Sequence, residues 1–500
     1  MKVVAILANL IVYLFMAFTV VVTVLYKRAV KNPEVAYGPK VTAFVDKLPI
    51  LYDKFYYSYS FPIFVALISL VSWFSGTAYV GISLFVILAC PILFLRRDIT
   101  PLYPLLFSCA MCFKDMSVAS DITFYTMVAP VAVCLVYKFV KFPVKQFYLG
   151  GLIFPLILVT AALFTGGLLS PYLSQYTDGL TYAIPMGPVL AVIYILFSNY
   201  TEKNKNTNFK KYFLFSLVFA IMSGAIQLIY QRFNMFINHL PFETAHTQVG
   251  WGHFNTVGSI ILLAVPACFY LMCHAKRIFP YLIAFGIFYG ATFLSGSDGS
   301  LAALGVFTPV LLVFGYLKMD RNKKALYLKL LLIILLIVSI GLFVLSDKLN
   351  EFIAKILDAF IDDRGRTWLY NDAMNLFRKY PVFGGGLGYH NDIYYNAVNN
   401  TFNFHSTLFQ VMGTMGIMGL VAYTVYFIAR YKILTKKNTP YNLFAFLSFT
   451  LFTVYGFVDC MEFFLMPSLT MATLLIYSVE FLNEKDNDIP LPLYHKLVKF

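Results

Sequence analysis

Long runs of apolar residues, separated by short polar loops, recur along the whole chain. A run of about 17–25 apolar residues is long enough to cross a bilayer as an α-helix. The pattern therefore predicts an all-α polytopic membrane protein with 12–15 transmembrane helices. Two candidate spans, 60–75 and 99–113, are short, and re-entrant or half-buried segments are the alternative there. The full set is 3–26, 60–75, 78–94, 99–113, 122–137, 147–170, 178–198, 212–230, 255–273, 278–295, 299–317, 325–346, 405–429, 439–461 and 464–482.

The longest polar segment, residues 347–404, also contains apolar positions at helical spacing. Residues 349–360 and 369–380 each carry such a stripe, which predicts two amphipathic helices on the bilayer or over the helix bundle. Pro381 should end the second helix, and the glycines after it permit tight turns or close approach of a ligand. We expect residues 1–500 to form a single integral membrane domain, with 347–404 as a structured loop.

The net charge of +14 comes from lysines and arginines that cluster in short loops between the apolar runs. The positive-inside rule places such loops in the cytoplasm. This assignment puts 231–254 and 347–404 on the outer face of the cytoplasmic membrane and makes 483–500 a cytoplasmic tail. Because no RNA-binding signature accompanies the charge, we expect no nucleic-acid partner. The basic loops are 138–145, 201–211, 274–277, 318–324 and 430–437.

Nothing in the sequence calls for a metal, a cofactor or a disulfide framework. The seven cysteines lie within or at the edges of apolar segments, where small buried side chains are the favoured interpretation. This holds for Cys109 and Cys112, although their spacing is C-x-x-C. No DxD pair, HExxH, P-loop or GxSxG motif occurs in a suitable context. We therefore expect no cofactor and no metal site.

His405 stands at the end of the long polar segment, where the next apolar span begins in HSTLFQVMGTMGIMG. Ser406 follows it as a candidate helix N-cap. A neutral imidazole can accept a proton, so His405 is a candidate general base, and an interfacial histidine satisfied by water is the alternative. Gly413, Gly416 and Gly419 recur at intervals of three, which predicts a helix face for close packing of another helix.

Arg364 and Arg366 lie between the two predicted amphipathic helices and are followed by Trp368. Guanidinium groups bind phosphate oxygens in bidentate fashion and keep their charge at physiological pH. Both arginines are therefore candidates for holding a diphosphate leaving group. The alternatives are snorkelling toward lipid headgroups and neutralisation by Asp362 and Asp363.

Two further motifs fall on the predicted outer face. In GWGHFN, Trp251, His253 and Asn255 stand at the start of a span, as a sugar platform or as an interfacial tryptophan anchor with turn glycines. SGSDGS joins two spans in what the composition predicts to be a tight turn, and Asp298 is its only acid.

Together these motifs resemble the O-antigen ligase and polysaccharide polymerase superfamily of bacterial envelope proteins. The hallmark of that family is a large outer loop ending in H-[N/S/Q]-x9-G-x-x-G, which fits His405, Ser406, Gly416 and Gly419. Upstream the family has an arginine followed by a tryptophan and P-x-x-G-x-G, matched here by Arg364, Trp368, Pro381, Gly384 and Gly386. GWGHFNTVGSIILLAVP resembles an earlier outer-loop motif, and the strong similarity covers residues 245–430.

The resemblance implies a C-type glycosyltransferase fold and a metal-independent enzyme. Such an enzyme transfers a glycan from undecaprenyl diphosphate to a glycan or lipid acceptor at the bilayer, with other polysaccharide-assembly proteins as further partners. A polymerase is slightly favoured over a ligase because polymerases are the broader class. The expected catalytic residues are His405, Arg364 and Arg366. The expected substrate-binding residues are Trp251, His253, Asn255, Trp368, Gly384, Gly386, Gly388, His390 and Ser406.

The chain departs from the family pattern at two places. Thr247 and Gln248 stand where the family often has an arginine, and Asp298 replaces the arginine of a frequent Ser-Arg-Gly. One expected phosphate contact is therefore missing or is supplied by Arg366 or Arg232. The alternative function is a lipid-linked oligosaccharide flippase or another transporter. Transporters typically show internal repeats and charged residues within their spans, and the sequence shows neither clearly.

Overall fold

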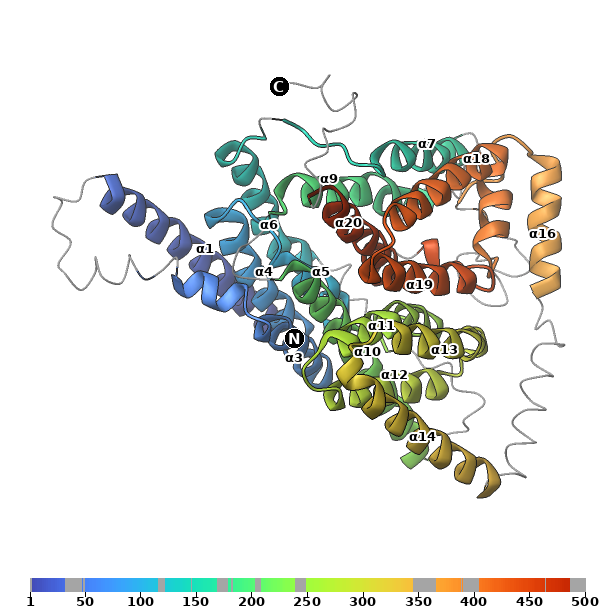
Figure 1. Cartoon of the computed structure of the whole chain (residues 1–500). Helices are drawn as coiled ribbons and strands as arrows, with labels where there is room; N and C mark the ends of the chain where they lie inside the picture. The colour runs from blue at the N-terminus through green and yellow to red at the C-terminus, as the bar shows by residue number, and fades with distance from the viewer. Residues whose placement is uncertain are drawn as a thin grey trace. The chain divides into compact units, whose positions relative to one another are not determined.

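The computed structural model describes residues 2–31, 47, 50–115, 122–144, 146–168, 179–180, 183–202, 208–238, 249–344, 366–387, 389, 404–463 and 465–485. Within these ranges the chain is helical and contains no strand (Figure 1). This confirms the prediction of an all-α polytopic membrane protein.

Every predicted span contains at least one helix, although the bounds differ. The first helices are α1 (Lys2–Lys31), α3 (Ser60–Ser75), α4 (Ala78–Leu95), α5 (Leu102–Ser108), η1 (Ala110–Cys112), α6 (Ile122–Lys141), α7 (Ile153–Leu168), η4 (Pro185–Val189), α9 (Leu190–Tyr200) and α10 (Phe209–Ile237). The later helices are α11 (Phe254–His274), α12 (Phe279–Ser295), α13 (Asp298–Lys318), α14 (Arg321–Val344), α16 (Arg366–Lys379), α18 (Thr407–Thr435), α19 (Pro440–Tyr455), η5 (Met461–Phe463), η6 (Leu465–Leu469) and α20 (Thr470–Lys485).

By length and apolar composition, six of the described helices could cross a membrane. The number is seven when the bent pair Ile50–Tyr56 and Ser60–Ser75 counts as one span. Several others, such as α12 with 17 residues and α19 with 16, are shorter. A multi-pass membrane protein is therefore confirmed, whereas 12–15 spans remains a prediction.

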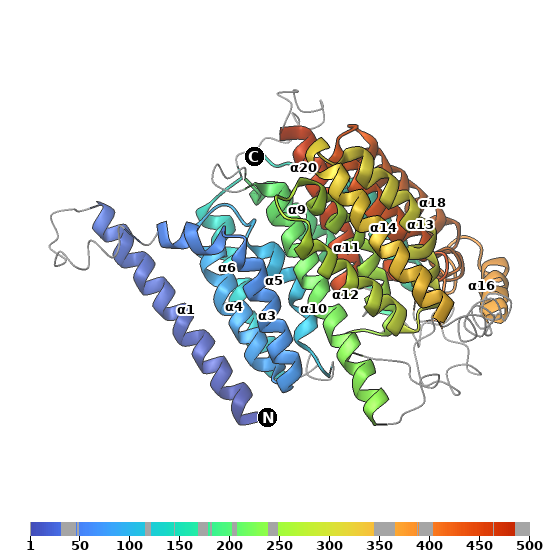
Figure 2. The ribbon, with the colours of Figure 1, turned by 60° about the horizontal axis from the view of Figure 1, so that its bottom comes forward.

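The chain divides into two compact units, and unit 1 comprises Met1–Gly150, Ile193–Val257 and Glu484–Phe500. Here α3, α4 and α6 lie side by side, with α1 along α4 and α6 and with α10 against α3 (Figure 2). Two hydrogen bonds join segments distant in sequence: the Tyr212 hydroxyl donates to Tyr56 O (2.8 Å), and Trp73 Nε1 donates to Val249 O (2.7 Å). Close packing of apolar side chains, together with hydrogen bonds between helices for the buried polar groups, is typical of helices in a membrane.

Unit 2 comprises Gly151–Val192 and Gly258–Asn483 and contains the candidate site. Its central helix, α18, packs against α7, α16 and α19, and α19 also packs against α13. The prediction for 439–461 was wrong at its end, because α19 stops at Tyr455. Residues 456–463 then run as turns and a short 3-10 helix, and we call them the acidic segment because they carry Asp459 and Glu462.

The prediction of a basic cytoplasmic loop over 430–437 was wrong for Arg430, which lies within α18 and is fully buried. Arg430 Nη1 donates to Oε1 (2.7 Å) and Oε2 (2.9 Å) of Glu462. The guanidinium also lies over the rings of Tyr426, Phe427 and Phe449. A buried charge persists only when it is paired, so this ion pair fixes the acidic segment to α18.

Candidate functional site

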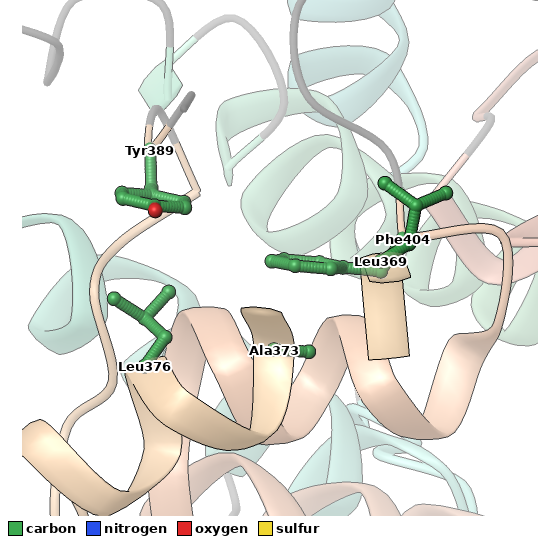
Figure 3. Packing of buried hydrophobic residues seen from close by; sticks show 5 residues of the cluster. All are labelled: Leu369, Ala373, Leu376, Tyr389 and Phe404. Atoms are coloured by element: carbon green, nitrogen blue, oxygen red, sulfur yellow. The ribbon is translucent and has the colours of Figure 1, made fainter. Parts of the chain in front are cut away.

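Helix α16 lies along the first part of α18 and covers the start of that helix. Leu369, Ala373 and Leu376 form the buried stripe of α16, and they pack with Tyr389 and Phe404 (Figure 3). Tyr370 adds a ring stacked on Phe409, with centroids 4.2 Å apart. The predicted amphipathic helix is thus confirmed, its apolar face packs on protein, and it ends at Lys379, before Pro381 as expected.

Helix α18 is broken at Gly416, whose φ of 61° and ψ of −150° are not helical. A break leaves carbonyls on one side and N–H groups on the other without intrahelical partners. The loop of residues 381–386 supplies the missing partners through four backbone hydrogen bonds. These are Gly385 N to Gly413 O (2.8 Å), Gly386 N to Thr414 O (2.9 Å), Ile417 N to Pro381 O (2.8 Å) and Met418 N to Val382 O (3.1 Å).

The two glycine motifs therefore form one backbone joint, made of residues 381–386 and 413–418. A Cβ on Gly384 would lie 2.4 Å from Met415 N, and one on Gly416 would lie 2.5 Å from Pro381 O. Only glycine fits such contacts at a positive φ. The expected common helix face for the three glycines was wrong at Gly416, although Gly413 does pack closely against Ala373 of α16. Gly384 and Gly386 act through their backbones here, and their contact with substrate stays a prediction.

His405 lies immediately before the N-cap position of α18, in a left-handed conformation with a φ of 50°. Its Nδ1 is 3.4 Å from Oδ1 of Asp459, and the exposed fraction is 34% for the His405 side chain and 4% for the Asp459 side chain. Ser406 occupies the expected N-cap position, but its side chain makes no capping hydrogen bond. This contact meets the distance of an ion pair but not the geometry of a hydrogen bond. A neutral imidazole with its proton on Nδ1 would keep the Nε2 lone pair to accept another proton.

Asp459 was missed from the sequence because its apolar surroundings placed it inside a predicted span. The acidic segment is joined to the start of α18 by Thr407, which donates from N to Gly456 O (2.8 Å) and from Oγ1 to Asp459 O (3.4 Å). The same segment reaches Arg430 through Glu462. His405 and Arg430 lie on opposite sides of the break at Gly416, and both contact this short segment.

Arg366 begins α16 and is half-buried. Its charge and that of Asp459 both act on the hydroxyls of Tyr370 and Tyr455. The Tyr370 hydroxyl donates to His405 O (3.4 Å), and burial raises the pKa of Tyr370 while the positive charge of Arg366 opposes that rise. The Tyr370 hydroxyl thus contacts the backbone of His405 and lies within electrostatic reach of both Arg366 and Asp459. Trp368, two residues on, is 41% exposed, and its contact with substrate stays a prediction.

The predicted turn SGSDGS is confirmed and borders the same group of residues. Gly296 has a φ of 73°, Ser297 is the N-cap of α13, and the Ser297 and Tyr455 hydroxyls are 2.9 Å apart. Asp298 also acts electrostatically on the Tyr455 hydroxyl. Four sequence predictions lie outside the described residues: Arg364, Gly388, His390 and the amphipathic helix at 349–360.

The GWGHFN motif belongs to unit 1, where the Trp251 ring is 5% exposed. Trp251 Nε1 donates to Gln227 Oε1 (2.6 Å), and Gln227 Nε2 donates to Met111 O (2.9 Å). A sugar platform needs an exposed ring face, which the buried Trp251 does not present here, and its contact with substrate stays a prediction. His253 and Asn255 are half-buried at the start of α11.

Arg232, the other suggested replacement for the missing arginine, is only 6% exposed in α10. No group of three His, Cys, Asp or Glu side chains with metal-binding geometry occurs among the described residues, and metal independence stays a prediction. All seven cysteines are free, and Cys112 is buried as expected.

The fold and the site define a polytopic all-α membrane protein in which a candidate base, His405, lies beside the carboxylate of Asp459 at the start of α18. Residues 282–424 match the family model described as O-antigen ligase. The matched part contains α13, α16, the backbone joint and His405, and it confirms the resemblance to the O-antigen ligase and polymerase superfamily. The family is one of glycosyltransferase-like enzymes. No curated protein matches the chain.

Proposed function

We propose that the protein is a membrane glycosyltransferase that polymerises or ligates lipid-linked oligosaccharide repeats on the outer face of the cytoplasmic membrane. The donor is an undecaprenyl-diphosphate-linked glycan, and no metal takes part. The observation that supports this most is the half-exposed His405, which lies inside the region that matches the O-antigen ligase family and beside the buried Asp459 from outside that region.

In this mechanism the acceptor hydroxyl attacks the anomeric carbon of the donor while its proton passes to Nε2 of His405. The bond from the anomeric carbon to the diphosphate oxygen breaks, and that oxygen keeps the electron pair. Arg364 and Arg366 stabilise the negative charge that develops there. Asp459 is a positioning residue, because its carboxylate holds the imidazole with the basic nitrogen toward the substrate.

The test is transfer by the purified protein from lipid-linked repeats, with the variants His405→Ala and Asp459→Asn. Loss of a general base typically lowers the rate about 10²–10⁴-fold. We expect that loss for His405→Ala and a smaller one for Asp459→Asn, because an amide still accepts the Cys460 N–H bond that Oδ1 holds at 2.7 Å. His274→Ala is the matched control, since His274 is an exposed histidine at the C-terminal end of α11. Near-normal transfer by His405→Ala would move the base assignment to His390.

Polymerase and ligase differ in what accumulates when the protein is deleted from cells. Single lipid-linked repeats accumulate without a polymerase, and full-length lipid-linked chains accumulate without a ligase. We favour the polymerase, and full-length chains in the deletion strain would reverse that preference.

The alternative function, a flippase or another transporter, gains one observation from the structure. Arg430 and Glu462 are charged residues buried within unit 2, a feature the sequence did not show clearly. Three aromatic rings enclose the guanidinium, which suits a fixed structural pair better than a moving one. Glycosidic bond formation by the purified protein would decide for the enzyme, because a transporter forms no product.

A further inference from the structure

The side chain of Gln410 contacts the chain neighbours of His405, the proposed base, and of Asp459, its carboxylate partner. Gln410 is buried on the first turn of α18, with 5% of its surface exposed. Its Oε1 accepts from Phe404 N (2.9 Å) and from Cys460 Sγ (3.5 Å). Phe404 directly precedes His405, and Cys460 directly follows Asp459, so one amide oxygen joins the two chain segments that carry the imidazole and the carboxylate.

The backbone of His405 needs such support because its φ of 50° is uncommon for a residue with a side chain. A conformation of this kind persists where surrounding contacts determine it, and such residues gather at functional sites. The bond from Phe404 N fixes the backbone of the residue before His405, and the bond from Tyr370 fixes the carbonyl of His405 itself. Gln410 N also donates to Ser406 O (2.8 Å), so backbone and side chain of one residue hold this turn.

We propose that Gln410 is a positioning residue that holds His405 against Asp459 for proton abstraction. This inference rests on the proposed role of His405 as the base. The group that acts is the neutral side-chain oxygen Oε1, which accepts the hydrogen bond from Phe404 N. An acceptor one bond closer to the backbone does not reach Phe404 N.

Three substitutions separate this role from simple packing. Gln410→Met keeps the volume and removes the acceptor, and Gln410→Asn moves the acceptor back by one methylene. Gln410→Glu, with the carboxyl protonated, keeps an acceptor at the same reach. The matched control is Thr292→Val, because Thr292 is buried in α12 and its hydroxyl donates to Phe288 O of its own helix (2.9 Å).

Transfer from purified lipid-linked repeats gives kcat and KM for each variant, and elution from a sizing column in detergent reports folding. A misplacement of about 1 Å at a reacting group costs on the order of 10²-fold. We expect kcat to fall about 10–100-fold for the Met and Asn variants, with KM within about twofold, since the substrate contacts remain. At acidic pH the kcat of Gln410→Glu should approach the kcat of the unmodified protein at the same pH. Thr292→Val should leave kcat unchanged.

The deciding measurement repeats Gln410→Met in a His405→Ala background. A residue that acts through His405 has no further effect once the imidazole is gone, so the two losses are not additive. Unchanged kcat in the Met and Asn variants, or an equal loss with and without His405, overturns the positioning role while the base assignment stands. Full activity of His405→Ala alone overturns the proposed base, and the positioning role with it.

Discussion

The backbone joint makes Gly416→Ala the most informative test of the architecture. Alanine at a φ of 61° and a ψ of −150° enters a region that is almost restricted to glycine. Its Cβ would lie 2.5 Å from Pro381 O and 2.7 Å from Val382 O, both of them backbone atoms. These carbonyls also accept the bonds from Ile417 and Met418, so relief of the clash opens the joint.

The expected loss of stability follows from these contacts. The backbone conformation costs about 1–3 kcal/mol for a residue with a side chain. Each of the two hydrogen bonds contributes about 0.5–1.5 kcal/mol. The total, about 2–6 kcal/mol, is a large fraction of the roughly 5–15 kcal/mol that holds a typical domain folded. Gly416→Ala should therefore unfold several degrees lower, and transfer activity should fall with it.

The assay is thermal unfolding of the purified protein in detergent, followed together with transfer activity. Gly305→Ala is the control, because Gly305 lies in the middle of α13 and a Cβ there meets nothing within 4 Å. Alanine in a helix interior is about 1 kcal/mol more favourable than glycine, so the control should melt at the same temperature or higher. Equal melting temperatures for Gly416→Ala and the unmodified protein would refute the joint as a structural element.

The remaining predictions concern Arg364, Arg366 and the topology. Arg364→Ala should weaken transfer severely and Arg364→Lys in part, because a lost charge-assisted contact costs about 1.5–3 kcal/mol. Complete loss of transfer on addition of EDTA, or full activity of Arg364→Ala, would contradict this mechanism. Arg366→Ala should be milder, unless Arg366 supplies the missing phosphate contact, in which case both alanine variants are inactive. A cysteine at Asn399 should react with an impermeant reagent in intact cells, and reaction only after lysis would invert the topology.

The positions of the helices could be predicted from the sequence because apolar runs determine where a chain enters a bilayer. The predicted spans at 60–75 and 299–317 differ from α3 and α13 by at most one residue at either end. The end of α16 followed from Pro381, which disfavours helix at the residue before it. Local chemistry decides each of these features, and local chemistry is visible in the order of residues.

The parts of the site that depend on distant segments could not be predicted. The break at Gly416 needs the loop of residues 381–386 to complete its hydrogen bonds, so the glycine spacing alone looked like a packing face. Asp459 and Arg430 were assigned by their neighbours, one to an apolar span and the other to a basic loop. Their contacts with His405 and Glu462 become visible only when α18 is folded.

The backbone joint and Gln410 attach both ends of the polar segment before His405 to one helix. Gly386 is bonded to α18 through Thr414, and Phe404 is bonded to the same helix through Gln410. The separation of these two anchors is therefore set by α18 and not by the residues between them. The position of the imidazole thus follows from the fold of α18 and not from the length of the stretch that joins the anchors.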